Sequence, residues 1–279
     1  MSKFESKVDF VALISVKKAN PNGDPNLANH PRTDYNGFGE ISDVCIKRKI
    51  RNRMQDLGNE IFVKSDDRAD DDCSCLKDRA KCLSAIKSQK EYAKKACEKW
   101  LDVRSFGQIF TKGFAGVSVG VRGPVSIHQA VSVDPVEVYP MQITKSVSGE
   151  RKNENERGSD TMGMKHFVRF GLYEIKGSIN VQLAEKTGFS AEDAQVIKEC
   201  LKTLFCNDAS SARPDGSMEV VKLIWWEHNC KDGQYSSAKV HRSVKVKPRD
   251  GVTVPSCVDD YEITVEELDG LTPEIIDCV

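Results

Sequence analysis

Apolar and polar positions alternate in blocks that predict strands and helices along most of the chain. Residues 8–16 (VDFVALISV) are β-branched and apolar with partial alternation, which predicts a central strand. The next block, 20–34 (NPNGDPNLANHPRTD), holds four Asn and three Pro. Because Pro interrupts both helix and strand patterns, this block is expected to be a loop. Structureless loops longer than about 12 residues are uncommon in compact domains unless they have a function.

A helix is predicted immediately after this loop. It is expected to begin at Ser42 or Asp43 as the N-cap and to run to about Leu57, where Gly58 ends it. Its apolar positions form one narrow stripe: Ile46, Ile50, Met54 and Leu57. Cations flank that stripe: Lys47, Arg48 and Arg51 on one side, Lys49 and Arg53 on the other. One side of the helix is therefore expected to pack while its flanks present positive charge.

The middle of the chain changes character twice. Residues 59–103 hold a polar, acidic loop and then a helical stretch over about 77–100, which together indicate an insertion. Residues 105–130 alternate Val and Gly, which predicts strands and tight turns in a second sheet region. Another strand is predicted over 135–145. Residues 146–161 contain almost nothing that can be buried and have apolar segments on both sides, so they predict the tip of a long hairpin.

The C-terminal part predicts one more helix among strands. Strands are expected over 173–183, 220–226 and 239–247. Ser190 is the expected cap of a helix with apolar residues at helical spacing: Ala194, Ile197, Leu201 and Leu204. The order of strand, helix, strands, hairpin, strand, helix and strands predicts an α+β fold of the ferredoxin-like or RRM class, with helices backing one sheet. A single elaborated domain over 1–279 is expected.

The composition indicates the class of protein, and the charged residues are unevenly distributed along the sequence. The chain is 39% hydrophobic and 30% charged, which is typical of globular proteins. It has no secretory pattern and no apolar run long enough to cross a bilayer, so we expect a cytoplasmic protein without a membrane segment whose ten cysteines are thiols. The net charge of -1 conceals basic blocks at 47–53 and 239–249, an acidic block at 66–72 and an acidic C-terminal tail at 259–279.

The residues for enzyme or metal chemistry are few. The sequence has no phosphate-binding loop motif and no HExxH or GxSxG motif, and its five His are not at metal-ligand spacing. Asp24 and Asp34 are able to hold Mg²⁺ for a nuclease, but Asp in such loops is more often a turn former. The insertion also holds four cysteines: Cys73, Cys75, Cys82 and Cys97. Paired CxxC units are missing, so thiols are favoured over zinc, and no cofactor is expected.

Several blocks resemble one known family. The block from Asn20 to Asn52, in which the loop leads into SDVCIKRKIRN, resembles the backbone subunit of type I CRISPR Cascade complexes. This family belongs to the RAMP superfamily, and the similarity is greatest to the subtype I-C form. The later blocks FGQIF, GVRGPVSIHQA, GSDTMGMKHFVRFGLY and KTGFS are similar in the same order, so the resemblance runs from Val8 to about Pro248.

The resemblance implies a fold and a role in CRISPR-Cas antiviral defence. The fold would be an RRM-like palm with an inserted helical fingers region over 59–103 and a β-hairpin thumb over 142–165. Copies would polymerise along the CRISPR RNA (crRNA), and each thumb would kink the RNA so that target DNA pairs with the guide between kinks. The subunit would be non-catalytic and would contact other Cascade subunits.

Residues of the loop, the helix and the hairpin are expected to hold this RNA. They are Asn20, Asn22, Arg32, Lys47, Arg48, Arg51, Thr161, Met162, Lys165 and His166. Cations and side-chain amides bind phosphate and 2′-hydroxyl groups without reading bases, as a variable guide requires. The cations of the helix are also compatible with an ordinary solvated face.

Two further sets of residues each fit two interpretations. Met162 and Met164 are either wedges between bases or core residues at a strand start. Four residues of the strand expected over 239–247 are either a second phosphate track or a solvated edge: Lys239, His241, Lys245 and Lys247.

Two competing functions also remain open. One is a backbone subunit that also cleaves target RNA with Asp34 and Mg²⁺, and the other is a zinc-stabilised scaffold. The aromatic signature of RNA-stacking RRM domains is absent, which removes one independent argument for RNA binding. The acidic block 66–72 is expected to lie away from RNA.

Overall fold

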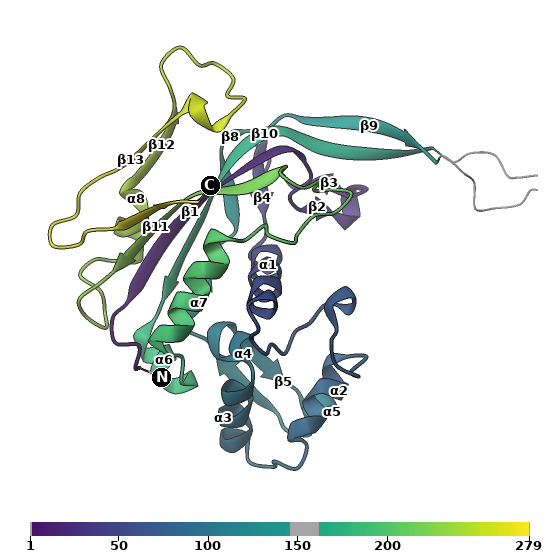
Figure 1. Cartoon of the computed structure of the whole chain (residues 1–279), viewed down its shortest axis with the longest axis vertical. Helices are drawn as coiled ribbons and strands as arrows, with labels where there is room; N and C mark the ends of the chain where they lie inside the picture. Colours follow the sequence, from purple (N-terminus) through teal and green to yellow (C-terminus); the bar gives the residue numbers. More distant parts are fainter. Residues whose placement is uncertain (1, 146–161, 279) are drawn as a thin grey trace, which may run out of the picture.

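The computed structural model describes residues 2–145 and 162–278, which are built around one large antiparallel sheet (Figure 1). In these residues eight strands join the sheet, in the order β14-β11-β1-β10-β8-β4, with β7 and β9 pairing onto β10. The strands are β1 (Val8–Ala19), β4 (Phe38–Ile41), β7 (Val125–Ile127), β8 (Ala130–Pro135), β9 (Val138–Thr144), β10 (Met162–Ile179), β11 (Met218–Glu227) and β14 (Glu274–Asp277). The expected mixed fold with a large antiparallel sheet is confirmed.

Smaller strand pairs and helices surround this sheet. The pairs are β2 (Gly23–Asp24) with β3 (His30–Pro31), β5 (Gly107–Phe110) with β6 (Val119–Arg122), and β12 (Val244–Pro248) with β13 (Tyr261–Val265). The helices are α1 (Asp43–Asp56), α2 (Leu76–Ala80), α3 (Gln89–Lys99), α4 (Leu101–Phe106), α5 (Lys112–Ala115), α6 (Val181–Thr187), α7 (Ala191–Lys202) and α8 (Ser237–Arg242). No helix in the described part of the chain has the length and apolar character needed to cross a bilayer.

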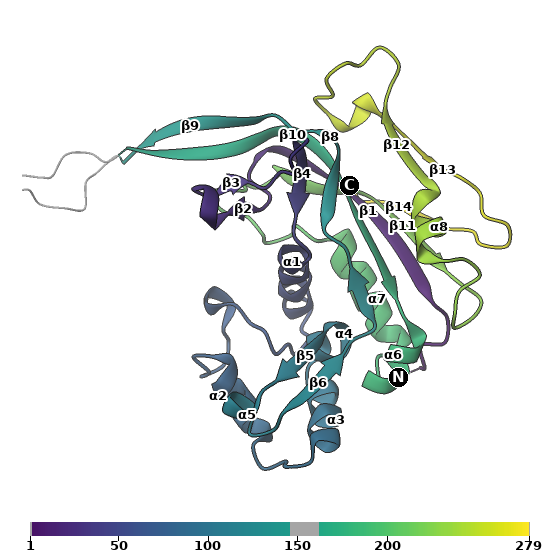
Figure 2. The same ribbon diagram turned by 180° about the vertical axis from the view of Figure 1, so that it is seen from behind.

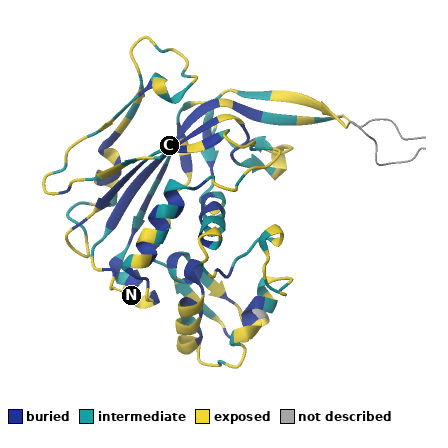
Figure 3. Cartoon of the chain, in the orientation of Figure 1, coloured by how far each residue is buried: buried dark blue, intermediate teal, exposed yellow. Residues whose placement is uncertain are grey.

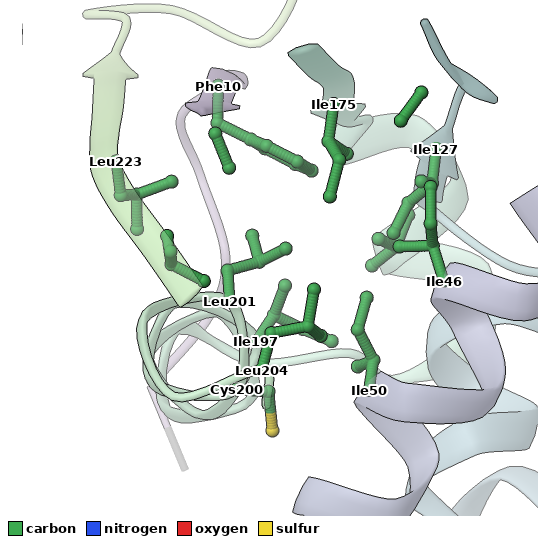
Figure 4. Packing of buried hydrophobic residues seen from close by; sticks show 14 of the residues in the cluster. Phe10, Ile46, Ile50, Ile127, Ile175, Ile197, Cys200, Leu201, Leu204 and Leu223 are labelled. Carbon is green, nitrogen blue, oxygen red and sulfur yellow. The ribbon is translucent and has the colours of Figure 1, made fainter. Parts of the chain in front are cut away.

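Strand β1 lies at the centre of the sheet and is covered on both faces. All of its residues from 8 to 16 are buried, which explains why their alternation in the sequence is only partial. Phe10 and Ile14 face the core under α1 and α7, where Ile46, Ile50 and Ile197 meet the sheet (Figure 4). The opposite face is covered by α8 and the β12–β13 pair, seen from behind in Figure 2.

The two long helices begin and end as their caps predict. The Ser42 hydroxyl accepts the Cys45 N–H at 3.2 Å at the start of α1, and Gly58 follows its end with φ of +80°. Helix α7 begins at a capping box in which Ser190 and Asp193 each accept the other's backbone N–H. The apolar stripe of α1 is buried as expected except for Leu57, which is exposed beyond the last turn.

A second, smaller core lies in the segment between α1 and β7. Its buried members include Phe62, Tyr92, Trp100 and Phe110, with ring centroids 4.7 to 5.3 Å apart for the pairs Phe62–Trp100, Phe62–Phe110 and Tyr92–Phe110. The helical stretch expected over about 77–100 is divided into two helices, because α2 ends at Ala80 and α3 begins only after the cap Ser88. Strands β5 and β6 contribute to this core, so it extends past residue 103.

The second sheet region expected over 105–130 divides between two sheets. Within residues 2–145 and 162–278, β5 and β6 pair only with each other, whereas β7 and β8 pair with β10 in the main sheet. Alternation of Val and Gly predicts strands but does not specify their partners, so the sequence does not show which strands join the main sheet.

Two strand predictions near the C-terminus also need correction. The strand expected over 239–247 is α8 and then β12, because Ser236 caps a short helix and Val240 and Val244 are buried four residues apart. The strand expected over 173–183 ends at Ile179, and the Asn180 side chain caps helix α6. In both cases a polar cap residue marks the change: Asn180 lies inside the expected strand, and Ser236 lies just before the other one.

The long hairpin expected after residue 135 is present as β9 paired with β10. Its register joins Val138 to Val168 and Thr144 to Met162, and the arm projects away from the sheet with much of its surface exposed (Figure 3). The expected polar tip over 146–161 lies outside the described residues.

Candidate nucleic-acid interface

Three segments that are far apart in the sequence meet at one end of the sheet. The β2–β3 pair follows β1, helix α1 follows β4, and the hairpin arm leaves the sheet where β10 passes β1 (Figure 1). Contacts between β3 and β10 join the first and third segments directly, since the rings of His30 and His166 stack with centroids 3.4 Å apart. Most of the candidate RNA-binding residues predicted from the sequence lie in these segments.

The loop expected over 20–34 has short elements of its own, the β2–β3 pair and a 3₁₀ turn at Pro25–Leu27. Asn20 is buried, and its amide nitrogen donates to the Asn29 carbonyl at 2.7 Å. Asn22 accepts the Ser42 N–H at 2.9 Å, which ties the loop to the start of α1. The two Asn side chains therefore shape the loop around the helix N-terminus.

The acidic residues of the loop have structural partners. Asp34 Oδ1 accepts the N–H groups of Asn36 and Phe38 at 2.8 and 2.9 Å, which is the bonding of a turn former. Asp24 caps the 3₁₀ turn by accepting the Asn26 N–H at 3.0 Å, and one of its oxygens lies 3.6 Å from an Arg32 terminal nitrogen. The Arg32 side chain is partly exposed and keeps its Nε buried without a partner in the described residues.

The cations along α1 differ in how far their charge is compensated. Lys47 pairs with Asp43 at 2.9 Å, one turn earlier on the same exposed side. Arg48 donates to the Val63 carbonyl at 2.8 Å and has no carboxylate partner among the described residues. Burial and the neighbouring Arg51 lower the pKa of Arg48, which still remains protonated at neutral pH. Of these two cations, Arg48 is therefore the one without a paired carboxylate in the described residues.

Arg51 has a structural partner in the second core. Its Nε donates to Asp102 at 2.9 Å, and the guanidinium lies 5.1 Å from the Phe106 ring. The Asp102 carboxylate also accepts the N–H groups of Phe62 and Val63 at 2.7 and 3.1 Å. This buried ion pair fixes the helix that carries the cations against the segment that follows it. On the other flank, Lys49 is buried and pairs with Asp208.

Of the candidate residues on the β10 side of the hairpin arm, the two methionines face outward. Met162 is 72% exposed and Met164 53% exposed, so the interpretation of both as core residues is wrong. Lys165 donates to the Ser211 carbonyl at 3.2 Å. Burial and the facing His30 ring lower the pKa of His166, which favours its neutral form. Thr161, the remaining candidate, lies outside the described residues.

The structure adds residues that the sequence did not single out. Lys17 and Lys18, at the end of β1, are exposed and have no ion pair among the described residues. The sequence feature that could have identified them is the presence of two consecutive lysines directly before the Asn-rich loop. The loop 207–217 also reaches this end of the sheet, where the Ala212 carbonyl accepts the Asn20 N–H at 2.9 Å. Nothing in the sequence of that polar loop places it beside residue 20.

The acidic block and the lysines of β12 have local partners. In the acidic block, Asp71 pairs with Arg79 at 2.7 Å, and Asp70 pairs with Lys64. On β12, Lys245 and Lys247 lie 3.7 and 3.0 Å from Glu266 and Glu262 of the neighbouring segment. In the residues that the structure describes, no three His, Cys, Asp or Glu side chains come together as a metal site.

His241, expected on a strand beside these lysines, lies in α8 instead. The side chain is buried and bonds to the Gly177 carbonyl at 3.0 Å, so it is not part of a phosphate track or of a solvated edge. Lys239, also expected there, lies in the same helix with its ammonium 4.1 Å from the centre of the Tyr235 ring.

Comparisons with known proteins point to one family. A protein named "CRISPR-associated protein Cas7" from Haloferax volcanii is 24% identical over 212 residues, which are 68% of this chain and 61% of that protein. The chain thus spans about three fifths of the length of this curated relative. A chain of the solved structure "CRISPR RNA-guided surveillance complex, pre-nicking" is 18% identical and covers 88% of this chain and 84% of its own, with a TM-score of 0.53.

A chain of a second "CRISPR RNA-guided surveillance complex" covers 88% of this chain and 78% of its own at 19% identity, with a TM-score of 0.49. At such low identity the first of these two matches indicates a shared fold. The model of the family described as "CRISPR-associated protein Cas7" matches residues 6–266, nearly the whole chain. This protein therefore belongs to the Cas7 family of CRISPR-associated proteins.

Proposed function

We propose that this chain is a non-catalytic backbone subunit of a CRISPR RNA-guided surveillance complex, of the type I-C form. Copies polymerise along the crRNA, hold its sugar-phosphate backbone and present the guide for pairing with target DNA, beside other subunits of the complex. The observation that carries the proposal is the meeting of the Asn-rich loop, α1 and the base of the hairpin arm at one end of the sheet of a Cas7-family chain.

Each of the three expected parts, palm, fingers and thumb, corresponds to a set of elements in the structure. The palm is RRM-like: the strand order β11-β1-β10-β8 with α1 after β1 and α7 after β10 is that of a β-α-β-β-α-β unit. The fingers are the segment with its own aromatic core, which begins near residue 59, and the thumb is the β9–β10 arm. In Figure 1 the thumb leaves the upper part of the body and the fingers lie below α1, so that the β2–β3 pair and α1 lie between them.

The proposed RNA contacts are divided between cationic side chains and neutral side chains. Arg48 and Lys47 bind phosphate, and Arg51 adds its terminal nitrogens while its Nε stays on Asp102. Arg32 adds charge from the loop. Asn20, Asn22 and His166 shape the path, Lys165 adds a cation, and Met162 is the exposed apolar residue that separates bases. Thr161 is proposed to contact the RNA on the basis of the resemblance alone.

The salt dependence of RNA affinity tests the proposed contacts of α1. Replacing Lys47 and Arg48 together by Ala should flatten the slope of log K against log salt by about 1.4, at about 0.7 per phosphate contact on a single strand. Arg51 is left in place because its loss would also break the ion pair with Asp102. The matched control replaces Lys87 and Lys90, exposed cations outside the proposed path, and should leave the slope unchanged. Equal slopes for both double variants would show that the α1 cations are a solvated face.

A further inference from the structure

A small hollow lies between the β2–β3 pair, the start of β10 and the loop before β11. Its volume is about 100 Å³, and its lining includes Asn20, Asn29, Lys165, His166 and Ser211. One water molecule needs about 10 to 15 Å³ by this measure, so the hollow has room for a larger group. Two of the lining residues, Asn20 and Lys165, come from segments 145 positions apart in the sequence.

Two polar atoms of the lining residues are buried and have no hydrogen-bond partner in the described part of the chain. They are Asn20 Oδ1 and His166 Nδ1. Asn20 is only 4% exposed, and its amide nitrogen is already bonded to the Asn29 carbonyl, so the unpaired atom is the oxygen. Buried polar atoms are nearly always hydrogen-bonded, so two unpaired ones at the same hollow fit a site that holds a polar group.

We propose that this hollow receives the 2′-hydroxyl edge of one ribose of the bound RNA, so that the subunit distinguishes RNA from DNA along the guide. The inference rests on the RNA-binding function proposed above and deepens it by naming the chemical group that is recognised. The hydroxyl donates its hydrogen to Asn20 Oδ1 and accepts a hydrogen from His166 Nδ1, which a neutral imidazole can carry.

The chemistry of the two atoms favours a hydroxyl over other parts of a nucleotide. An amide oxygen only accepts hydrogen bonds, and a phosphodiester oxygen carries no hydrogen to donate. A base amino group does donate, but a guide of variable sequence does not present one at a fixed position. The 2′-hydroxyl is present on every ribonucleotide and is both donor and acceptor.

The surroundings supply the place for the adjoining phosphate. Lys165 lines the same hollow and uses one of its three donors on the Ser211 carbonyl, which leaves two for a phosphate oxygen. The stack of His30 on His166 holds the imidazole ring in place from the opposite segment. The hollow and the lysine together match one sugar and its phosphate.

The test compares RNA with 2′-fluoro RNA of the same sequence, at one salt concentration and at lengths that bind one copy. The fluorine keeps the sugar conformation of RNA, but it has no hydrogen to donate to Asn20 Oδ1 and is a poor acceptor of a hydrogen from His166 Nδ1. The wild-type protein should bind RNA about three- to tenfold more tightly than 2′-fluoro RNA, the contribution of about one hydrogen bond. His166→Phe keeps a ring on His30 but removes both nitrogens, and it should lower this ratio toward one.

A matched control is His128→Phe. His128 is exposed, and its backbone N–H bonds to the Lys176 carbonyl, ten residues further along β10 than His166. This variant should keep the wild-type ratio. Equal binding of both RNAs by the wild type, or an unchanged ratio in a folded His166→Phe, would overturn the ribose assignment while the RNA-binding function stands. Absence of binding to any RNA would instead refute the proposed function itself.

Discussion

At the scale of single residues, the ion pair between Arg51 and Asp102 joins two parts of the fold. Asp102 lies in the second core and holds the backbone of Phe62 and Val63 as well as the guanidinium. A run of cations along one helix does not reveal which of them is already paired, because the partner lies 51 residues away. The sequence therefore predicts equal roles for the cations of α1, whereas the structure separates Arg48 from Arg51.

Arg51→Ala should therefore destabilise the folded protein as well as weaken RNA binding. Loss of the guanidinium leaves the buried Asp102 carboxylate with backbone partners only, which should lower the free energy of unfolding by about 3 kcal/mol. Lys47→Ala breaks an exposed pair on the same helix and should change it by less than about 1 kcal/mol. Urea unfolding measures both. Equal stability of the two variants would contradict the structural role of Arg51.

A second buried carboxylate, Asp9, is expected to make the stability of the protein depend on pH in the acid range. Asp9 is fully buried and bonds to His228 Nε2 and Lys7 Nζ, both at 2.8 Å. Burial alone would raise its pKa, but the hydrogen bonds from His228, Lys7 and Ser237 lower it below the ordinary value of 3.8. The stabilisation is thus complete above the unfolded pKa and is lost as the pH falls through the folded one.

Asp9→Asn should remove this contribution. At neutral pH the variant should lose about 3 kcal/mol of unfolding free energy, because Lys7 loses its charged partner. Below about pH 4, near the unfolded pKa of an Asp, the stability of the wild type should fall more steeply than that of the variant. Urea midpoints measured from neutral pH into this acid range give the two slopes, and parallel slopes would show that Asp9 is not the group responsible.

At the scale of elements, the helices with strong caps and stripes were the most predictable. Helix α1 and helix α7 start at the Ser residues that the sequence identified, because capping is a local interaction. The prediction over 239–247 failed where a short-range pattern fits two structures, and tertiary packing decided between them. The convergence of the loop, α1 and the arm depends on the pairing of β1 with β10, which are distant in the sequence, and no local pattern specifies that pairing.

The β9–β10 arm gives a prediction at this scale. Met162 and Met164 are exposed, so replacing both by Ser should change the free energy of unfolding by no more than about 0.5 kcal/mol. The same variant should assemble more weakly on long RNA, because it lacks Met162, the apolar side chain proposed to separate bases. Met54→Ala in the core of α1 should lose about 2 to 5 kcal/mol in the same unfolding assay. Normal RNA assembly by the double Ser variant would remove Met162 from the proposed interface.

At the scale of the whole molecule, the proposed function depends on repeated binding along one RNA. The sheet and the segment with its own core form the body of the molecule, from which the β9–β10 arm projects (Figure 1). Such a shape is suited to contact both a nucleic acid strand and the next copy. Family membership, the shared fold and the convergent candidate residues all support this arrangement. A nuclease with Asp34 is less consistent with it, because that carboxylate accepts two backbone N–H groups in a turn.

The most direct measurement is a native gel shift of the purified chain with single-stranded RNAs of increasing length, with and without Mg²⁺. Assembly along the RNA predicts a ladder of discrete complexes that gains one protein for each fixed increment of RNA, with the RNA intact in both conditions. A single complex at every length would contradict such assembly. Fragments that appear only with Mg²⁺ would contradict a non-catalytic backbone, and Asp34→Ala would then be the next variant to test.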